Sequence, residues 1–161
     1  MVKSYNLYLD VCCLNRPFDD WSQERVRLEG EVILSILARV EAKQWQITSS
    51  EAVEVELMRM TNLEKLKNVR RLLSLAHQVI FLDSSIDQRS QDLESLGFGL
   101  YDSFHIACAE IAKVDVLLTT DDRLLRKAKS YSSGLNVTVE NPVNWLMSIF
   151  QNEGESNHDT P

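Results

Sequence analysis

Carboxylates follow two apolar runs that lie far apart in the chain. Asp10 directly follows the run of residues 5–9. Asp121 and Asp122 come shortly after the run of residues 114–118. Because ligand sites in an open α/β sheet form outside the carboxyl ends of strands, we expect these acids to meet at one sheet edge. Two carboxylates 4 Å apart repel by about 4 kcal/mol at an effective dielectric of 20, so such a cluster requires a cation. Oxygen ligands suit Mg²⁺ or Mn²⁺, and the pattern predicts a metal-dependent enzyme acting on phosphate esters.

A third group of acids lies on the helix expected after residue 47. Thr48 and Glu51 have the spacing of a capping box, which accounts for Glu51. Glu54 and Glu56 are two residues apart, so they face nearly opposite sides of a helix. The neighbours of Glu56 one turn away are mostly apolar, whereas those of Glu54 are mixed. We therefore prefer Glu56 as the site residue and keep Glu54 as the alternative.

Asp102 is the fourth candidate and lies near the start of an expected helix. The helix dipole favours a negative charge at that position. Taken alone, an Asp at a helix start is better explained as an N-cap than as a catalytic residue.

Alternating strand and helix patterns predict an α/β fold: three layers, α/β/α, around a mainly parallel central sheet. Besides the runs before Asp10 and Asp121, the expected strands are residues 44–47, 79–82 and 135–140. The expected helices are residues 22–43, 48–60, 63–76, 86–96, 100–113, 123–129 and 143–150. Residues 15–20 are expected to be a polar connection. We predict one domain over residues 1–150 and a disordered tail over residues 151–161, which has no apolar side chain to anchor it.

The composition is that of a soluble globular protein. The 161 residues are 44% hydrophobic and 25% charged, and the net charge of −7 argues against a large nonspecific nucleic-acid surface. No apolar run reaches the length of a membrane span, and the N-terminus lacks the features of a signal peptide. The three cysteines form no C-x-x-C pair, so neither a disulfide framework nor a zinc site is indicated. We expect a cytoplasmic protein.

Four acidic motifs occur in one order along the chain. Asp10 closes the first strand, Glu56 lies in a Ser-…-Glu-Leu context, Asp102 opens the segment Asp-Ser-Phe-His-Ile-Ala-Cys-Ala, and Asp121 ends Thr-Thr-Asp. Together they resemble the PIN-domain family, the small α/β nucleases that include VapC-type toxin ribonucleases. The resemblance covers nearly the whole chain up to Phe150.

This resemblance implies a PIN-like fold and a metal-dependent ribonuclease that cleaves single-stranded RNA. It implies that Mg²⁺ or Mn²⁺ is held by Asp10, Glu56, Asp102 and Asp121, directly or through water. The metal ions would activate a water molecule and stabilise the charge that develops on the phosphate. The family also implies the toxin of a type II toxin–antitoxin pair, with a cognate antitoxin, a homodimeric state and no membrane association.

The chain departs from the family pattern beside the first acid. Two residues after that acid the family often has Thr, Ser or Asn, but this chain has Cys12, a poor hydrogen-bond donor. Asn15 is a candidate to take over that role. Asp122 is either an auxiliary ligand or a favourable acid in the first turn of its helix.

Basic residues flank three of the acidic motifs. Arg16, Arg59 and Arg123 are candidates for phosphate contacts, because the guanidinium group suits bidentate binding of phosphate. An exposed role in solubility is equally compatible with each position. His105, one helical turn beyond Asp102, is predicted to pack or cap locally.

Two other functions fit parts of the pattern. One is a catalytically inactive PIN-like domain that binds RNA or a protein. The other is a different acid-rich α/β phosphohydrolase with an aspartyl nucleophile. That chemistry usually has a second acid two residues after the first, a position that Cys12 occupies here.

Overall fold

Five short strands form one parallel sheet in the computed structural model, which describes residues 3–158 and the side chains of residues 3–154. The strands are β1 Asn6–Leu9, β2 Gln46–Ser50, β3 Gln78–Ile80, β4 Val116–Leu118 and β5 Val139–Glu140. Their order is β3-β2-β1-β4-β5, and every neighbouring pair is parallel. The chain builds β2 and β3 on one side of β1 and then crosses to β4 on the other. The crevice for a ligand is therefore expected outside the carboxyl ends of β1 and β4.

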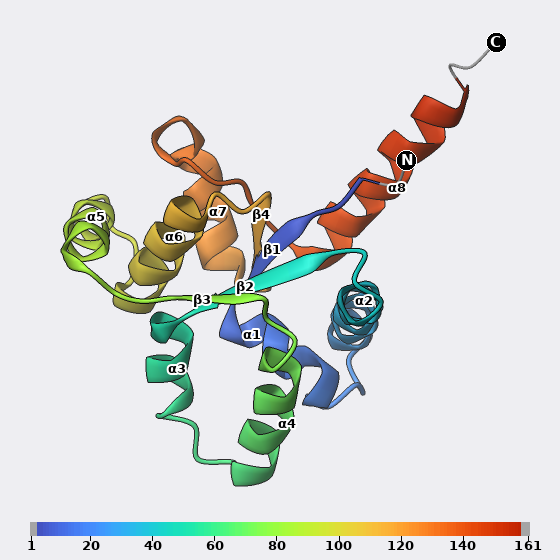
Figure 1. The fold of residues 1–161 in the computed structure, drawn as a ribbon, viewed down its shortest axis with the longest axis horizontal. Coiled ribbons are helices and arrows are strands. Elements are labelled where there is room, and N and C mark those ends of the chain that lie inside the picture. Colours follow the sequence, from blue (N-terminus) through green and yellow to red (C-terminus); the bar gives the residue numbers. More distant parts are fainter. Residues whose placement is uncertain (1–2, 159–161) are drawn as a thin grey trace.

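Helices cover both faces of the sheet (Figure 1). In that view α5, α6 and α7 lie on one side of the strands, and α1, α2 and α4 lie on the other. The α-helices are α1 Val11–Asn15, α2 Glu24–Glu41, α3 Glu51–Leu57, α4 Leu63–Leu73, α5 Ser84–Ser95, α6 Leu100–Ala112, α7 Asp122–Ser130 and α8 Pro142–His158. Two 3₁₀ turns, η1 Arg16–Phe18 and η2 Ser132–Gly134, complete the described elements. The predicted three-layer α/β architecture is confirmed.

The central strands are buried because helices pack on both of their faces. Leu7 and Tyr8 of β1 and Leu117 of β4 are completely inaccessible, and Ile33 of α2 and Ile106 of α6 are equally buried. The apolar runs that predicted β1 and β4 are therefore core strands. Their fixed positions determine where Asp10 and Asp121 leave the sheet.

The edge strands are shorter and more exposed than predicted. Residues 79–82 were expected to form a buried strand, but β3 ends at Ile80, with Val79 44% exposed and Phe81 73% exposed. Of residues 135–140, only Val139 and Glu140 form the strand beside β4, and the Thr138 carbonyl before them accepts the Leu117 N–H at 2.8 Å. Each edge strand has a single neighbour, so its apolar residues contribute less to the core than the same residues would in β1.

Residues 11–18 are helical, and residues 15–18 of these belong to the segment that was expected to be a polar connection. Helix α1 begins at Val11, whose backbone N–H donates to Asp10 Oδ1 at 2.7 Å, and η1 follows directly. One helical turn is too short to show a hydrophobic period, which explains why the sequence pattern missed it.

Helix α3 is capped by Ser50 and not by Thr48. The Ser50 hydroxyl accepts the backbone N–H of Val53 at 3.3 Å, whereas Thr48 lies inside β2. Strand β2 extends to Ser50 instead of ending at residue 47, and α3 ends at Leu57, earlier than expected. The Glu51 carboxylate accepts the backbone N–H of Leu82 at 2.7 Å and so connects α3 to the segment after β3.

The last helix continues beyond its predicted end at Phe150. Helix α8 runs to His158, whereas residues 151–161 were expected to be disordered, and residues 159–161 lie outside the described residues. Trp145, Leu146 and Ile149 anchor its first half in the core, while the far half extends away from the other elements (Figure 1). The domain boundary at residue 150 stays a prediction. Among the described residues, no helix is both long and apolar enough to cross a membrane.

Candidate active site

Asp10 joins the carboxyl ends of β1 and β4. Its backbone N–H donates to the Leu118 carbonyl at 3.0 Å, which extends the pairing of the two strands by one residue. Its carboxylate is buried, with Oδ1 bound to the Val11 N–H at 2.7 Å and Oδ2 accepting the Thr119 hydroxyl at 2.9 Å. Strand register thus fixes both the position and the orientation of this acid.

Thr119 supplies a hydroxyl donor to Asp10 that sequence reasoning missed. The Cys12 sulfur lies 3.3 Å from Asp10 Oδ2 and 3.4 Å from the Thr119 hydroxyl, and it accepts the Thr120 N–H at 3.3 Å. Asn15, the proposed substitute, has a buried side-chain carbonyl without a hydrogen-bond partner among the described residues. Asp10 Oδ2 therefore accepts from the weak thiol donor of Cys12 and, at a shorter distance, from the Thr119 hydroxyl just after β4.

Glu56 and Glu54 have different surroundings. Glu56 Oε1 lies 3.5 Å from His105 Nε2, and the same nitrogen lies 3.7 Å from Asp10 Oδ1. Glu54 instead forms an ion pair with Arg70 at 2.7 Å on the solvent side of α3. The fold therefore brings Glu56, and not Glu54, next to Asp10.

His105 lies between these acids and the protein core. It is completely buried, and its Nδ1 lies 2.6 Å from the Tyr8 hydroxyl, which in turn lies 2.6 Å from the Ser50 hydroxyl. Burial by itself would lower the pKa of His105, but the carboxylates of Glu56 and Asp10 outweigh that effect and raise it. The sequence puts His105 on the same helix face as Asp102 and predicts that it packs or caps locally, but its proximity to Glu56 and Asp10 was not predicted.

Asp102 lies in the first turn of α6 and is not its cap, because the helix begins after Gly99. The pKa of Asp102 is raised to about 6, mainly by burial and further by the charges of Asp10, Asp121 and Glu56, while His105 opposes the rise. Acids from four separate segments therefore influence one another electrostatically.

Asp121 caps α7 at the rim of the site. Its Oδ1 accepts the N–H groups of Arg123 at 2.9 Å and Leu124 at 3.4 Å. Asp122 faces elsewhere and forms a bidentate ion pair with Arg25, with both distances 2.8 Å, which lowers the pKa of Asp122. This pairing favours the interpretation of Asp122 as a structural first-turn acid.

Asp102 and Asp121 line an open cavity of about 890 Å³ between α7 and the loop before α6. Three cations from α7 also line it: Arg123, Arg126 and Lys127. The Lys127 ammonium lies 5.8 Å from the ring centres of both Phe98 and Tyr131. Gly97, with φ of +98°, has no side chain that would collide with this ammonium. Lys127 was not predicted from the sequence.

The other two candidate arginines lie in different surroundings. Arg16 is bound to Glu29 at 3.0 Å and to Asp19 at 2.9 Å. Arg59 is exposed and donates to the Tyr101 hydroxyl at 2.8 Å, which places it beside the residue that precedes Asp102. Of the three arginines predicted for phosphate contacts, Arg123 is the one that lines the cavity with Asp102 and Asp121.

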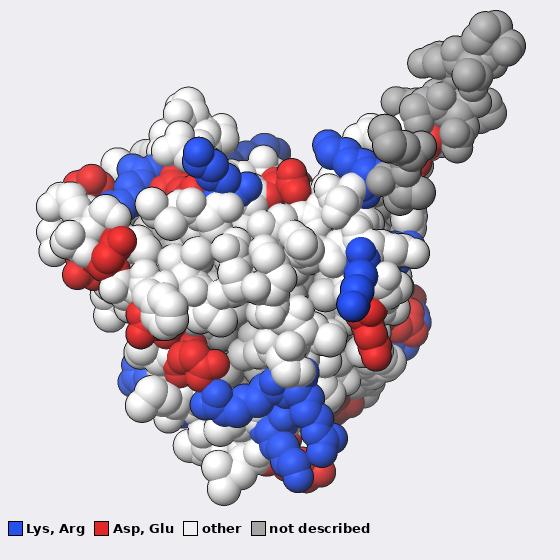
Figure 2. Space-filling view, viewed as in Figure 1, with Lys and Arg blue, Asp and Glu red and all other residues white. Residues whose placement is uncertain are grey.

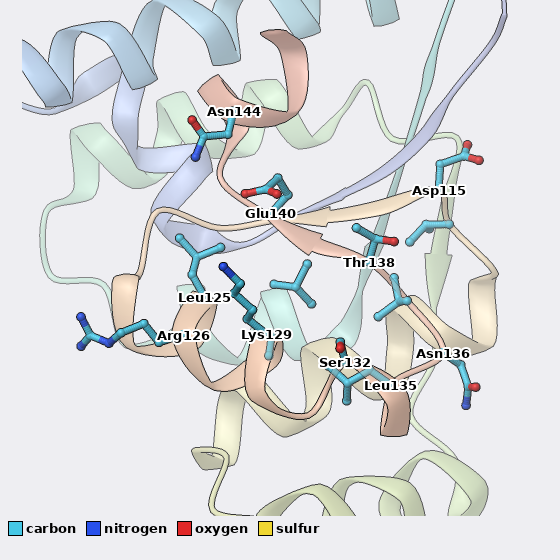
Figure 3. Close-up of a pocket in the computed structure, with 14 residues that line it drawn as sticks. Asp115, Leu125, Arg126, Lys129, Ser132, Leu135, Asn136, Thr138, Glu140 and Asn144 are labelled. Carbon is cyan, nitrogen blue, oxygen red and sulfur yellow. The ribbon is translucent and has the colours of Figure 1, made fainter. Parts of the chain in front are cut away.

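A second cavity, of about 770 Å³, lies between α7 and β5 and is lined by none of the four acids (Figure 3). Lys129 points into it, whereas Arg126 extends away from it. Figure 2 shows a further group of basic side chains over α4, the helix that carries Lys65, Lys67, Arg70 and Arg71. Arg126 lines both cavities, Lys127 lines only the cavity that contains Asp102 and Asp121, and Lys129 lines only the other.

The side chains at the sheet edge fit a divalent cation. One ligand atom from each of Asp10, Glu56 and His105 lies within 4.8 Å of the other two, and Asp102 and Asp121 add charge nearby. Carboxylate and imidazole groups are ligands for divalent ions of the first transition row, and carboxylates also suit Mg²⁺. A cation would relieve the repulsion that raises the pKa of Asp102.

Comparisons with known proteins agree with this geometry. The model of the PIN domain matches residues 8–130. The fold is similar to the crystal structure of VapBC2 from Rickettsia felis bound to a DNA fragment from its promoter, with a TM-score of 0.54 and 16% sequence identity over 84% of this chain and 98% of that chain. A comparison with curated proteins gave no match. The family match spans the segments that carry all four acids, and the chain belongs to the PIN-domain family.

Proposed function

We propose that this protein is a metal-dependent ribonuclease that cleaves phosphodiester bonds in single-stranded RNA. The observation that carries the proposal is the convergence of Asp10, Glu56, Asp102 and Asp121 at the carboxyl ends of β1 and β4. Burial raises the pKa of Asp102, and the charges of Asp10, Asp121 and Glu56 add to that rise. A cluster of this kind requires a cation at neutral pH, and its ligands would be these four acids.

The chemistry follows from a bound ion beside a phosphate. When bound, Mg²⁺ or Mn²⁺ supplies an activated water and stabilises charge on the phosphoryl oxygens. Asp10 is held rigidly by Val11 and Thr119, so its free lone pairs keep a fixed direction. Asp102 must lose its proton to act as a ligand, and a cation favours that loss.

The cavity beside Asp102 and Asp121 supports a single-stranded substrate. Its volume of about 890 Å³ is in the range of pockets that hold small ligands, and Asp10 is only 6% exposed. A flexible strand can place one phosphate against such recessed acids, whereas an A-form duplex is recognised across its wide minor groove. Arg123 and Lys127 would hold the neighbouring phosphates, and Tyr131 offers an aromatic ring to a base.

We also propose that the enzyme is the toxin of a toxin–antitoxin pair and forms a homodimer. The fold similarity to the VapBC2 structure supports this assignment, together with the family match. The partner would be a cognate antitoxin encoded by a neighbouring gene. Co-expression of that gene should restore growth of cells that the wild-type protein arrests.

Cleavage of a labelled single-stranded RNA with Mn²⁺, with Mg²⁺ and with EDTA tests the nuclease. Cutting with either metal and none with EDTA is the expected result, and Asp10→Asn should be inactive. A protein that binds metal and RNA but never cuts would support the inactive PIN-like module. Trapping of a phosphorylated aspartate would support the aspartyl phosphohydrolase.

A further inference from the structure

We propose that the site binds its metal ion through His105 Nε2 as well as through carboxylates, and that it therefore selects Mn²⁺ over Mg²⁺. The inference rests on the proposed metal-dependent function and adds a nitrogen ligand to the four acids. Imidazole suits first-row transition ions, whereas Mg²⁺ prefers oxygen ligands alone. One nitrogen donor at this site would thus change which ion the enzyme takes up.

The distances around His105 Nε2 support ligation. The nitrogen lies 3.5 Å from Glu56 Oε1 and 3.7 Å from Asp10 Oδ1, which is longer than a strong N–H···O bond. Ligand atoms bound about 2.1 Å from one ion are separated by roughly 3–4 Å. Both distances from the nitrogen lie in this range, and one ligand atom from each of the three residues lies within 4.8 Å of the other two. The Glu56 side chain is 25% exposed, which leaves it free to adjust and leaves a route for the ion.

The other side of the imidazole ring is held by a buried chain of hydroxyl groups. His105 Nδ1 lies 2.6 Å from the Tyr8 oxygen, and the Tyr8 oxygen lies 2.6 Å from the Ser50 oxygen. If Nδ1–H donates to Tyr8, the Tyr8 proton has Ser50 as its acceptor, and Nε2 keeps a free lone pair. This is the tautomer that a metal ligand needs, and a partner on the second nitrogen is the usual way to fix it.

Backbone geometry keeps this arrangement in place. Tyr8 belongs to the central strand β1, and Ser50 ends β2 and caps α3 through the Val53 N–H. The side chain of Ser50 therefore connects the helix that carries Glu56 to the hydroxyl that orients His105. The contacts among β1, β2 and α3 thus orient the imidazole of His105 and also hold the helix that carries Glu56.

The test is pulsed electron paramagnetic resonance of the full-length protein with bound Mn²⁺. Wild type should show ¹⁴N modulation from a directly bound imidazole, and His105→Gln should lose it. His77→Gln is the matched control, because His77 contacts the Ile47 carbonyl outside the site, and it should keep the signal. Tyr8→Phe removes the hydroxyl partner and should weaken Mn²⁺ binding about 10–100-fold while retaining the modulation.

Isothermal titration gives a second measurement that does not depend on RNA. The ratio of Mn²⁺ to Mg²⁺ affinity should fall at least tenfold in His105→Gln and stay unchanged in His77→Gln. Wild type that binds Mn²⁺ without ¹⁴N modulation overturns the inference, even if His105→Gln fails to fold. If that wild type still cuts RNA, the proposed nuclease stands without the nitrogen ligand. Nitrogen-bound Mn²⁺ in a protein that cuts no RNA refutes the nuclease alone.

Discussion

Asp10 and Asp102 are both acids of the candidate site, but their surroundings differ. Asp10 accepts the Val11 N–H and the Thr119 hydroxyl. Asp102 accepts no hydrogen bond on its side chain among the described residues, and its pKa is raised. Ionisation of Asp102 is therefore unfavourable in the folded protein, and we test its effect on the free energy of unfolding at this residue and not at Asp10.

We predict that Asp102→Asn stabilises the metal-free protein above pH 6. The pKa of Asp102 is about 6 when folded against 3.8 for the ordinary side chain. The unfolded chain thus releases this proton first as pH rises, and the free energy of unfolding falls between about pH 4 and pH 6. The full effect is at most about 3 kcal/mol, and partial exposure and salt reduce it to about 1–2 kcal/mol.

Thermal melting in EDTA at pH 4 and pH 7.5 measures this effect. The melting temperature of Asp102→Asn should exceed that of wild type only at the higher pH. Excess Mn²⁺ should reverse this order, because a ligand that binds only the folded state stabilises it. Asp87→Asn, at an exposed acid in α5, is the control and should follow wild type. Equal melting of wild type and Asp102→Asn in EDTA at both pH values would contradict the raised pKa.

Glu56→Gln and Glu54→Gln should separate the two acids of α3. Glu56 lies beside His105, whereas Glu54 pairs with Arg70. The rate of RNA cleavage should fall at least about a hundredfold in Glu56→Gln, the scale expected when one group that stabilises transition-state charge is lost. Glu54→Gln should keep most of the activity. The opposite ranking would exclude Glu56 as the second acid.

At the scale of elements, the short helix α7 lines two different cavities. Its N-terminus holds Asp121 at the site, and Lys127, one and a half turns later, lines the same cavity. Lys129 points into the cavity beside β5 (Figure 3). Two lysines that differ by two positions on the helix therefore provide a matched pair.

Lys127→Gln should weaken binding of a single-stranded RNA measured with Ca²⁺ in place of the reactive metal. Losing one phosphate contact should lower the slope of log affinity against log salt by roughly 0.7. Lys129→Gln changes the net charge by the same amount but should leave that slope unaltered. An equal loss in both variants would mean that α7 attracts RNA only through its overall charge.

At the scale of the whole molecule, α8 closes the fold with its first half. Trp145 packs edge-to-face against Tyr5 and Trp45, and the side chains of residues 151–154 are exposed. The buried part of α8 thus supports the strand that leads to Asp10, although its far half lies away from the sheet.

Deletion of residues 151–161 should leave the melting temperature within about 2 °C of wild type, because it removes little buried apolar surface. Deletion of residues 145–161 should prevent stable folding, because Trp145, Leu146 and Ile149 are lost from the core. Circular dichroism melts of the two truncated proteins measure both effects. A large loss in the shorter deletion would show that the domain extends beyond residue 150.

The sequence by itself determined the elements whose signal is local. The apolar run before Asp10 and the helical periods of α2 and α6 are properties of neighbouring residues, and with the order of the acids they were enough to predict the α/β fold and the PIN resemblance. Tertiary structure decided the rest, because the deciding contacts join residues far apart in the chain. The choice between Asp122 and Asp121 depends on Arg25, and the placement of His105 depends on Tyr8 and Glu56. Spacing along one helix cannot reveal such partners, because Arg25, Tyr8 and Glu56 belong to other elements of the fold.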